Sequence, residues 1–373
     1  MLALDGQLRQ EFSVRAGNPR AMRAAILREY GEPLEVRELP TPEPAPDGAV
    51  VAVEACGLCR SDWHAWQGHG EWNDDRVPRG QVLGHEPAGT VLVVGPDVDR
   101  VAEGDRVVVP FSLGDGTCHN CRSGHGNVCS NGLALGFEPA APGAFAEQVA
   151  VPAADHNLVA LPETLTARDA AVLGCRYMTA YHALVDRAGL DGGDWLAVHG
   201  CGGVGLSAVQ LGTALGARVL AVDPDEVARE RARSLGASAT IDPGNTDPVA
   251  AIQARTGGGA DISVDALGIA ETCRNSVRCL RERGTHAQVG LTTDRERGEV
   301  PLPTDWMTRW EITFVGSRGM PPVGYDDLFD LVTATGIDPG GLVARELSLD
   351  AVSDRLAAMS GFDTDGVEVL TGI

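Results

Sequence analysis

The pattern of apolar and polar positions changes near residue 177. Before it, short apolar runs such as Val50–Val53 and Val107–Val109 are separated by Pro-rich joints such as Thr41–Pro46. Such runs, bounded by turn residues, are typical of β-strands. After residue 177, apolar stretches of strand length alternate with longer helical ones. The pattern therefore predicts a mostly β region followed by an α/β region.

The second region predicts regular alternation of strand and helix. Strands are expected at Trp195–His199, Arg218–Val222, Ile262–Asp265, His286–Val289 and Ile312–Val315, and helices at Val204–Leu215 and Asp225–Leu235. Alternation of this kind predicts a doubly wound parallel sheet with crossover helices. The final segment, about 319–373, reads as mixed helix and strand. We therefore assign the chain to the α/β class.

Length and composition set the limits of the architecture. A chain of 373 residues with 43% apolar residues suits two domains. It has no run of eighteen apolar residues, so no transmembrane helix is expected. Its N-terminus lacks a continuous apolar core and is not expected to be a signal peptide. Residues 1–21 precede the patterned chain and are expected to form an N-terminal extension, either a disordered tail or the result of a start codon placed too early.

Charge and cysteine content narrow the setting. The net charge of −22 argues against nucleic-acid and anionic-membrane partners. All 30 basic residues are Arg. An acidic chain without Lys fits a cytoplasm of high salt, where charge repulsion is screened; a GC-rich genome would explain the missing Lys but not the excess acid. The nine cysteines fall in metal-like spacings, which favours reduced thiols in a cytoplasm over disulfides.

A glycine-rich turn follows the strand expected at Trp195–His199. It contains Gly200, Gly202, Gly203, Val204 and Gly205, in a G-x-G-x-x-G pattern with an extra glycine. In a dinucleotide-binding unit the first glycine makes a tight turn, the second admits the pyrophosphate, and the last lets helix and strand pack closely. The helix N-terminus then offers free N–H groups to the phosphates. The turn predicts a nucleotide site.

Asp223, at the end of the next strand, selects the cofactor. A carboxylate there accepts hydrogen bonds from the adenosine ribose and repels the 2′-phosphate of NADP. We therefore expect NAD. Asp223 could also cap a helix that opens at Pro224, and both roles are compatible. Arg229 and Arg231 lie nearby and could soften the preference.

Three short motifs upstream predict a catalytic metal. They are Cys59-Arg60-Ser61-Asp62-Trp63-His64, Gly84-His85-Glu86 and Gly174-Cys175. Cys and His are ligands that suit zinc, and three protein ligands with one open position define a catalytic zinc site. Taken singly, each residue could be ordinary core packing. Cys56 and Cys59 also form a C-x-x-C pair, so the residues alone do not decide which of the two binds metal.

These motifs, in this order, resemble the zinc-dependent alcohol dehydrogenases of the medium-chain dehydrogenase/reductase superfamily, over about residues 22–373. The resemblance implies a split GroES-like, mostly β catalytic domain (22–176 and 319–373) around a Rossmann NAD-binding domain (177–318). It makes Cys59, His85 and Cys175 the zinc ligands and Cys56 a bystander. A cysteine rather than a glutamate as third ligand moves the expectation towards simple alcohols and aldehydes.

The resemblance also implies roles around the zinc. Arg60 would contact the cofactor pyrophosphate, Thr179 would lie near the nicotinamide, and Phe111 would line the substrate pocket. A proton would pass from the alcohol through Ser61 and the nicotinamide ribose to His64. Independently of the resemblance, the carboxylates of Asp62 and Glu86 directly flank the ligand motifs and would tune the charge around the metal or bond to its ligands.

A second cysteine cluster lies in a glycine-rich loop. In the family, four cysteines hold a structural zinc, and here the first of them is Asp115, followed by Cys118, Cys121 and Cys129. Carboxylate is an acceptable zinc ligand, so an Asp-Cys-Cys-Cys zinc site is expected; the alternative is a decayed site with a solvated Asp115. His119 and His125 are expected to be surface residues.

The chain departs from the family near its C-terminus. A basic residue that reaches the cofactor phosphates is often found there, but the run here is Gly366-Val367-Glu368-Val369-Leu370. That phosphate contact is in doubt, and Arg318 is a candidate substitute.

The resulting hypothesis is a cytoplasmic, zinc-dependent, NAD-linked alcohol dehydrogenase acting on a small alcohol or aldehyde, as a homodimer or homotetramer. The enzymatic alternative is a related dehydrogenase for polyols, sugars or a formaldehyde–thiol adduct. The non-enzymatic alternative is a relative that binds the cofactor without catalysis.

Overall fold

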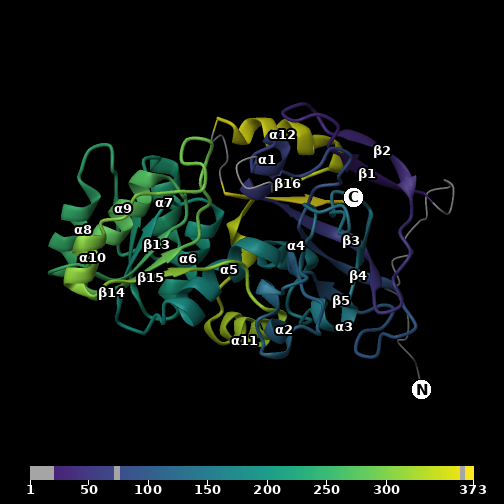
Figure 1. Ribbon diagram of the computed structural model, residues 1–373, viewed down its shortest axis with the longest axis horizontal. Helices are drawn as coiled ribbons and strands as arrows, with labels where there is room; N and C mark the ends of the chain where they lie inside the picture. Colours follow the sequence, from purple (N-terminus) through teal and green to yellow (C-terminus); the bar gives the residue numbers. More distant parts are fainter. Residues whose placement is uncertain (1–20, 71–75, 362–365) are drawn as a thin grey trace, which may run out of the picture.

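The computed structural model describes residues 21–70, 76–361 and 366–373, which fold around two larger β-sheets that lie in opposite halves of the molecule (Figure 1). Of the extension expected at residues 1–21, residues 1–20 lie outside the described part, and Ala21 begins the first strand.

The α/β half contains a parallel sheet with the strand order β12-β11-β10-β13-β14-β15. The strands are β10 (Trp195–His199), β11 (Arg218–Val222), β12 (Ala239–Ile241), β13 (Ala260–Asp265), β14 (Leu280–Gln288) and β15 (Thr313–Gly316). Neighbouring strands are all parallel. The order reverses between β10 and β13, and that switch point is where open α/β sheets bind their ligands.

Helices cover this sheet on its two faces (Figure 1). They are α6 (Gly203–Ala214), α7 (Glu226–Ser234), α8 (Pro248–Thr256), α9 (Ala270–Arg278) and α10 (Thr304–Trp310). The predicted doubly wound parallel sheet is therefore confirmed. β14 is longer than expected because its first residues, Leu280–Gly284, are mostly charged and give no apolar signal.

The other half is built on a mainly antiparallel sheet of order β16-β17-β3-β4-β5-β9, with β8 also paired to β3. The strands are β3 (Ala49–Leu58), β4 (Glu86–Val94), β5 (Arg106–Val108), β8 (Gln148–Val151), β9 (Val159–Ala160), β16 (Val343–Leu347) and β17 (Val367–Thr371). A hairpin of β1 (Ala21–Ile26) and β2 (Glu35–Pro40) lies beside it. Because β17 pairs antiparallel with β3, the end of the chain returns to the half in which it began.

A continuous helical run joins the two halves. It consists of α4 (Ala167–Val172), the π-helical turn η3 (Leu173–Tyr177), α5 (Met178–Tyr181) and the π-helical turn η4 (His182–Arg187). One buried hydrophobic cluster packs against this run. It includes Ala88 from the antiparallel sheet and Leu196 from the parallel sheet. The domain boundary expected between residues 176 and 177 falls inside this run and stays a prediction.

Smaller elements complete the fold. α1 (Arg60–Gln67) follows β3 and packs against α12 (Val352–Met359). A lobe contains β6 (Ser112–Leu113), α2 (His119–Arg122), η2 (Gly126–Val128) and β7 (Leu133–Ala134). The remaining helical elements are α3 (Ala154–Asn157), η5 (Pro322–Gly324), α11 (Tyr325–Thr335), η6 (Pro339–Leu342) and η7 (Leu349–Ala351). Within the described residues, no helix has the length and apolar content to cross a membrane.

Candidate active site

Three elements bring the predicted catalytic zinc ligands together. Cys59 precedes α1, His85 precedes β4, and Cys175 lies in the π-helical turn η3. Their candidate ligand atoms, together with a carboxylate oxygen of Glu86, all lie within 4.8 Å of one another, and all four residues are buried. π-helical turns are often found at functional sites. Cys56 is also buried, but its thiol donates to the carbonyl oxygen of Gly57 and is outside this cluster.

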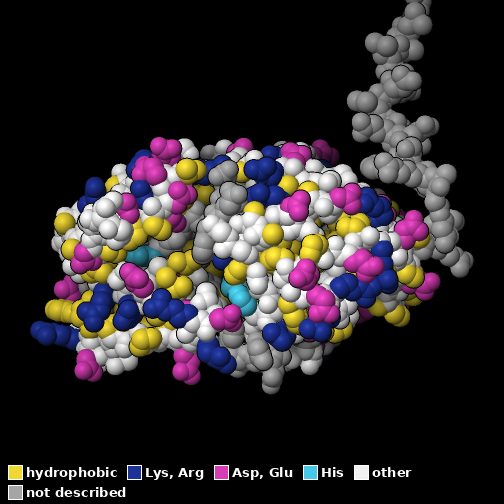
Figure 2. Space-filling view, turned by 90° about the horizontal axis from the view of Figure 1, so that it is seen from above, with side chains coloured by type: hydrophobic (Ala, Val, Ile, Leu, Met, Phe, Trp, Pro, Cys, Tyr) yellow, Lys and Arg dark blue, Asp and Glu magenta, His cyan; other side chains and the backbone are white. Residues whose placement is uncertain are grey.

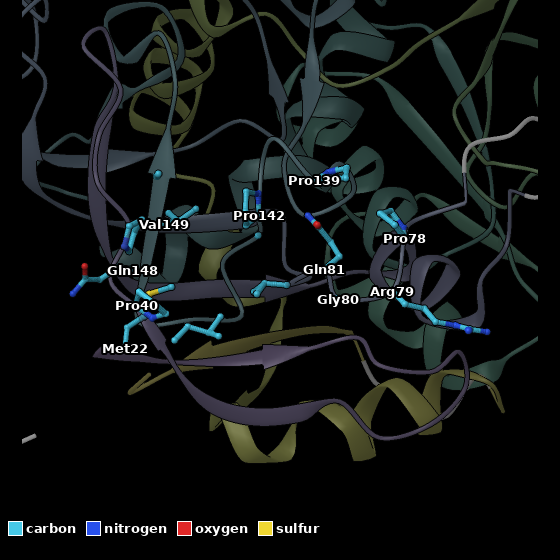
Figure 3. A pocket seen from close by; sticks show the side chains of 15 residues that line it. Met22, Pro40, Pro78, Arg79, Gly80, Gln81, Pro139, Pro142, Gln148 and Val149 are labelled. Atoms are coloured by element: carbon cyan, nitrogen blue, oxygen red, sulfur yellow. The ribbon is translucent and has the colours of Figure 1, made fainter. Parts of the chain in front are cut away.

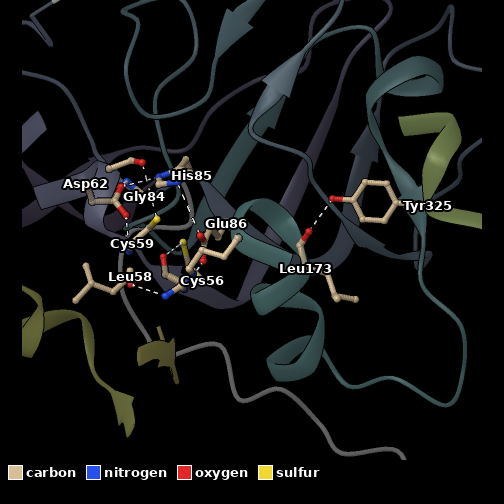
Figure 4. Close-up of polar contacts among 12 residues, drawn as sticks. Cys56, Leu58, Cys59, Asp62, Gly84, His85, Glu86, Leu173 and Tyr325 are labelled. Carbon is tan, nitrogen blue, oxygen red and sulfur yellow. Dashed lines mark hydrogen bonds and ion pairs between the residues drawn. The ribbon is translucent and has the colours of Figure 1, made fainter. Parts of the chain in front are cut away.

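Asp62 fixes the orientation of His85 (Figure 4). Its Oδ1 lies 2.9 Å from His85 Nδ1 and accepts from the backbone N–H of Gly84, while Oδ2 accepts from the backbone N–H of Cys59. The proton therefore resides on Nδ1, and Nε2 presents its lone pair. His85 Nε2 is buried without a hydrogen-bond partner in the described residues. A carboxylate behind the ring and a free nitrogen in front are the usual arrangement of a metal-binding histidine.

The thiols of the cluster favour a metal as well. The hydrogen bond from Cys175 lowers the pKa of the Cys59 thiol well below its usual value, and His85 acts in the same direction. The thiolate is the form that binds zinc. Two cysteines, an oriented histidine and a position left open by them fit a catalytic zinc.

Glu86 occupies the side of the cluster that faces η3. Its Oε2 forms an ion pair with Arg176. Its Oε1 has no hydrogen-bond partner among the described residues and lies 3.9 Å from His85 Nε2. Burial raises the pKa of Glu86 to about 8. The sequence analysis expected Glu86 to tune the charge around the metal or to bond to its ligands, and in the structure one of its carboxylate oxygens lies among the predicted ligand atoms. Arg176 was missed, although its place directly after Cys175 is a signal that could have found it.

The predicted dinucleotide turn lies between β10 and α6. Gly200 has φ +92°, and a Cβ at Gly205 would collide with the carbonyl oxygen of Gly200. Gly202 is the N-cap residue of α6 and Val204 lies in its first turn; no side chain caps the helix, so its first N–H groups are available to a ligand. A small cavity of about 50 Å³ is lined by Gly202, Gly203 and Arg231.

Asp223 follows β11 and lies beside this turn. Its Oδ2 accepts from the backbone N–H of Cys201 at 2.7 Å, and its Oδ1 accepts from the backbone N–H of Asp225 at 2.9 Å. Asp225, not Asp223, caps α7 through its side chain. Each Asp223 oxygen retains a lone pair for a ribose hydroxyl.

The two residues expected to carry the proton lie on α1. Ser61 Oγ is 3.9 Å from Cys59 Sγ. His64 Nδ1 lies 2.8 Å from His69 Nδ1, and His69 Nε2 lies 3.3 Å from Asp294 Oδ2 in the other half of the molecule. Burial and the neighbouring His69 and Arg60 lower the pKa of His64 to about 4, below the ordinary value of about 6.5 that the sequence suggested. His69 was missed although it lies only five residues after His64, and Asp294 was missed because it meets His69 only through the fold.

Three further predicted residues are placed as follows. Phe111 lies edge-on to His85 with ring centroids 5.8 Å apart, and Phe137, which was missed, lies at 4.9 Å. Thr179 Oγ1 is buried without a partner in the described residues. Arg60 stacks on the Trp63 ring in α1 and donates to the carbonyl oxygen of Met359 in α12.

The predicted second metal site is gathered in the lobe. The candidate ligand atoms of Asp115, Cys118, Cys121 and Cys129 lie within 4.8 Å of one another. Backbone N–H groups point at the sulfurs, for example from Asp115 to Cys129 and from Cys121 to Cys118, both at 3.4 Å. The bond from the Cys121 N–H lowers the pKa of Cys118 to about 7. Such N–H···S bonds favour thiolates, so the donors fit zinc.

Asp115 is held in place by the lobe itself. Oδ1 accepts from the N–H groups of Thr117 and Cys118, and Oδ2 accepts from the Asn131 side chain at 2.7 Å. These bonds, that from Asn131 first, hold the pKa of Asp115 well below its usual range. His119 and His125 are exposed and are not part of the group.

The C-terminal run supplies no cation to the turn. Val367 is buried, and Glu368 is paired with Arg355 and Arg345. Arg318 lies over the Phe111 ring and donates to the carbonyl oxygen of Asn127 in the lobe. Its contacts therefore lie on the substrate side rather than at the glycine turn.

A separate cavity lies away from these residues (Figure 3). It has a volume of about 470 Å³ and is lined by Met22, Pro40, Pro78, Gln81 and Gln148, among others. None of the predicted site residues lines it, so we assign it no part in the chemistry.

A buried Cys-His-Cys centre beside a dinucleotide turn, at the switch point of a parallel sheet, defines a zinc- and nucleotide-dependent oxidoreductase. Comparison with family models agrees. Residues 45–163 match the alcohol dehydrogenase GroES-like domain, and residues 203–334 match the zinc-binding dehydrogenase domain.

Individual relatives cover nearly the whole chain. An NAD-dependent alcohol dehydrogenase of Sulfurisphaera tokodaii is 33% identical over 94% of this chain and 99% of the relative. An alcohol dehydrogenase of Rhizobium meliloti is 36% identical over 89% of this chain and 93% of the relative. The structure of an alcohol dehydrogenase from Thermus sp. ATN1 superposes with a TM-score of 0.86 at 31% identity, over 94% of this chain and 99% of that chain. The chain belongs to the zinc-dependent alcohol dehydrogenases of the medium-chain dehydrogenase/reductase superfamily.

Proposed function

We propose that this protein transfers a hydride between a small alcohol and NAD, giving the aldehyde or ketone and NADH. The observation that carries the proposal is the buried group of Cys59, His85 and Cys175, in which His85 Nε2 is oriented and unpartnered. Family membership supports zinc and NAD as the cofactors. Cys175 as the third ligand favours simple alcohols as substrates. Polyols, sugars and a formaldehyde–thiol adduct remain the alternative substrates.

The proposed division of labour follows from the donor set. When bound, zinc supplies Lewis-acid chemistry at the alcohol oxygen, and NAD supplies the hydride acceptor. Cys59, His85 and Cys175 would hold the metal, and Asp62 fixes the orientation of the His85 ring. Phe111 and Phe137 form apolar walls beside His85 that exclude water.

The hydroxyl proton leaves through this chain's own groups. Ser61 can accept it and donate its own, because a hydroxyl does both. We propose that His64, further along α1, takes the proton onward; a bound cofactor would supply the ribose hydroxyl that links Ser61 to His64. His64 is neutral near pH 7, since burial lowers its pKa to about 4, so it would hold the proton only in passing. The contact between His64 and His69 offers the next step outward.

We propose that two features hold the dinucleotide: the backbone N–H groups at the start of α6 and the carboxylate of Asp223. The free N–H groups at the start of α6 receive the phosphates, and Asp223 accepts from the adenosine ribose. We propose NAD rather than NADP because this carboxylate repels a 2′-phosphate. Thr179, with its unpartnered hydroxyl, is proposed to bond the nicotinamide end.

In the lobe we propose a structural zinc held by Asp115, Cys118, Cys121 and Cys129. For the whole chain we propose a cytoplasmic homodimer or homotetramer adapted to high salt. All nine cysteines are free, which supports a reducing compartment.

The test is an NAD-reduction assay over primary alcohols, secondary alcohols, polyols and sugars, with zinc content measured in the same samples. Cys59→Ser is expected to lose the catalytic zinc and nearly all turnover while it still binds NADH. Cys56→Ser is the matched control, because Cys56 is equally buried three residues away but lies outside the cluster. Full activity of metal-free Cys59→Ser protein, or preference of the native protein for NADP, would refute the proposal.

A further inference from the structure

Arg176 is a buried cation that the proposed mechanism leaves without a task. It lies in η3 directly after the zinc-binding Cys175, and only 6% of its side chain is exposed. Its Nη2 pairs with Glu86 Oε2, and its Nη1 donates to the carbonyl oxygen of Leu58 at 3.2 Å. The third guanidinium nitrogen, Nε, is buried and has no partner in the described residues. A guanidinium offers five N–H donors, and an unmet buried donor is rare enough to need an explanation.

The other end of this side chain lies against the dinucleotide turn. A Cβ built on Gly203 would collide with Arg176 Cδ and would lie 3.4 Å from Arg176 Nε. Gly203 is the first residue of α6, whose uncapped N–H groups face the proposed pyrophosphate position. Arg176 therefore spans the distance from the carboxylate beside the zinc ligands to the helix N-terminus that receives the cofactor.

Two glycines make room for the arginine in this position. A Cβ on Gly57 would collide with Glu86 Oε2 and would lie 2.8 Å from Arg176 Nη2. Gly203 does the same at the other end of the side chain. The backbone of strand β3 and that of helix α6 thus close around one arginine side chain, which leaves it little freedom to move away.

The negative charge of a bound dinucleotide would require a cation close to the glycine-rich turn. A dinucleotide pyrophosphate carries two negative charges, which the protein must match. The C-terminal run cannot supply a cation, because Val367 is apolar and Glu368 is acidic. Arg60 donates to the carbonyl oxygen of Met359, and Arg318 donates to the carbonyl oxygen of Asn127.

We propose that Arg176 binds the pyrophosphate of the cofactor and joins it to Glu86, so that the metal site and the dinucleotide site share one cation. This inference rests on the dinucleotide site proposed above. Its rival is a purely structural role, in which Arg176 only neutralises Glu86. The two differ in what happens to ligands that contain the pyrophosphate.

The experiment measures binding of three probes by calorimetry: NADH, ADP-ribose, which keeps the pyrophosphate, and adenosine, which lacks it. For Arg176→Gln, affinities for NADH and ADP-ribose are expected to fall roughly 10- to 100-fold, the range for a lost hydrogen bond to a charged group. Affinity for adenosine should stay within about twofold. Arg176→Lys should recover part of the loss, because it restores the charge without the fork of donors.

Glu86→Gln is the matched control. It removes the ion pair but keeps the guanidinium, so ADP-ribose affinity is expected to be retained. If Arg176→Gln does not fold, the double variant Glu86→Gln/Arg176→Gln removes both buried charges and is expected to show the same selective loss. An unchanged ADP-ribose affinity, or an equal loss for adenosine, would overturn the proposal. If the unmodified protein bound no NADH at all, the dinucleotide site itself would be refuted, which is a distinguishable result.

Discussion

Unpartnered polar atoms around the proposed zinc carry the most information at the level of single residues. His85 Nε2, Glu86 Oε1, Thr179 Oγ1 and Arg176 Nε are all buried without a hydrogen-bond partner in the part of the chain that the structure describes. Each such group costs about 1–3 kcal/mol. Four of them meet where two cofactors are proposed to bind. The cofactors would supply the missing partners, which explains why the fold tolerates them.

The proton route gives a prediction at this scale. Ser61→Ala should reduce turnover by ~10²–10⁴-fold, the usual contribution of a positioned acid–base group, because no other hydroxyl in the motif lies beside Cys59. His64→Gln should reduce it less, by roughly tenfold near pH 7, because water can partly replace a terminal shuttle. Added imidazole buffer should restore part of the His64→Gln rate.

The measurement is steady-state turnover from pH 6 to 9, with ordinary and deuterated alcohol to establish that hydride transfer limits the rate. A His64→Gln enzyme that keeps native rates over this whole range, with a full isotope effect, would eliminate the relay.

At the scale of elements, the lobe is a loop built around the proposed structural zinc site. Only short elements occur in it, so the four donors and their N–H···S bonds hold much of its shape. Asp115→Ala is expected to reduce zinc from two ions per chain to one and to lower the Tm by several degrees, while NADH affinity stays unchanged. His119→Ala, an exposed change in the same lobe, is the control. An unchanged metal count in Asp115→Ala would exclude Asp115 as a ligand.

A buried histidine in the parallel sheet, His199, is expected to make the folding stability depend on pH. His199 ends β10, is buried against Cys279, and has a pKa lowered to about 3 by burial and by the neighbouring His286. In the unfolded chain a histidine titrates near pH ~6.5. Between these values the unfolded state binds more protons, so stability is full above pH ~6.5 and falls as pH drops towards 3.

This shift predicts that His199 alone costs about 2 kcal/mol of stability between pH 7 and pH 5, at 1.36 kcal/mol per pH unit below ~6.5. His199→Asn should lose that part of the pH dependence, so its stability deficit relative to the native protein should shrink by the same amount. Urea unfolding at both pH values measures it. A deficit that is constant with pH would contradict the assignment.

Elements with strong local patterns were predictable from the sequence, and long-range contacts were not. β10 and β11 matched their expected ranges, because each is an apolar run closed by a turn residue. The range predicted for β14 was too short, because Arg281, Glu282 and Arg283 at its start carry no apolar signal. The proposed zinc ligands lie in motifs that the sequence shows, but the pairing of Arg176 with Glu86 joins residues 90 positions apart and leaves no local trace. The same holds for His69 and Asp294, whose contact joins the two halves of the molecule.

Charge is the property that belongs to the whole molecule. Acidic side chains are spread over both halves on the face seen in Figure 2, interspersed with arginines. The net charge of −22 nevertheless leaves a large excess of like charge, which destabilises a compact state in dilute buffer. At ~1 M salt the Debye length falls to about 3 Å, so this repulsion is almost fully screened.

The last prediction follows from this balance. Dialysis from ~2 M to ~0.05 M KCl is expected to lower the Tm and the turnover, and to loosen any oligomer, because repulsion then acts over distances of more than ~10 Å. Thermal unfolding and light scattering across the salt series measure the effect. Sodium sulfate at matched ionic strength separates screening from the strengthening of apolar burial, which sulfate adds. An unchanged Tm and unchanged activity at low salt would show that the fold tolerates its acidic surface without salt. That result would refute the proposed adaptation to high salt.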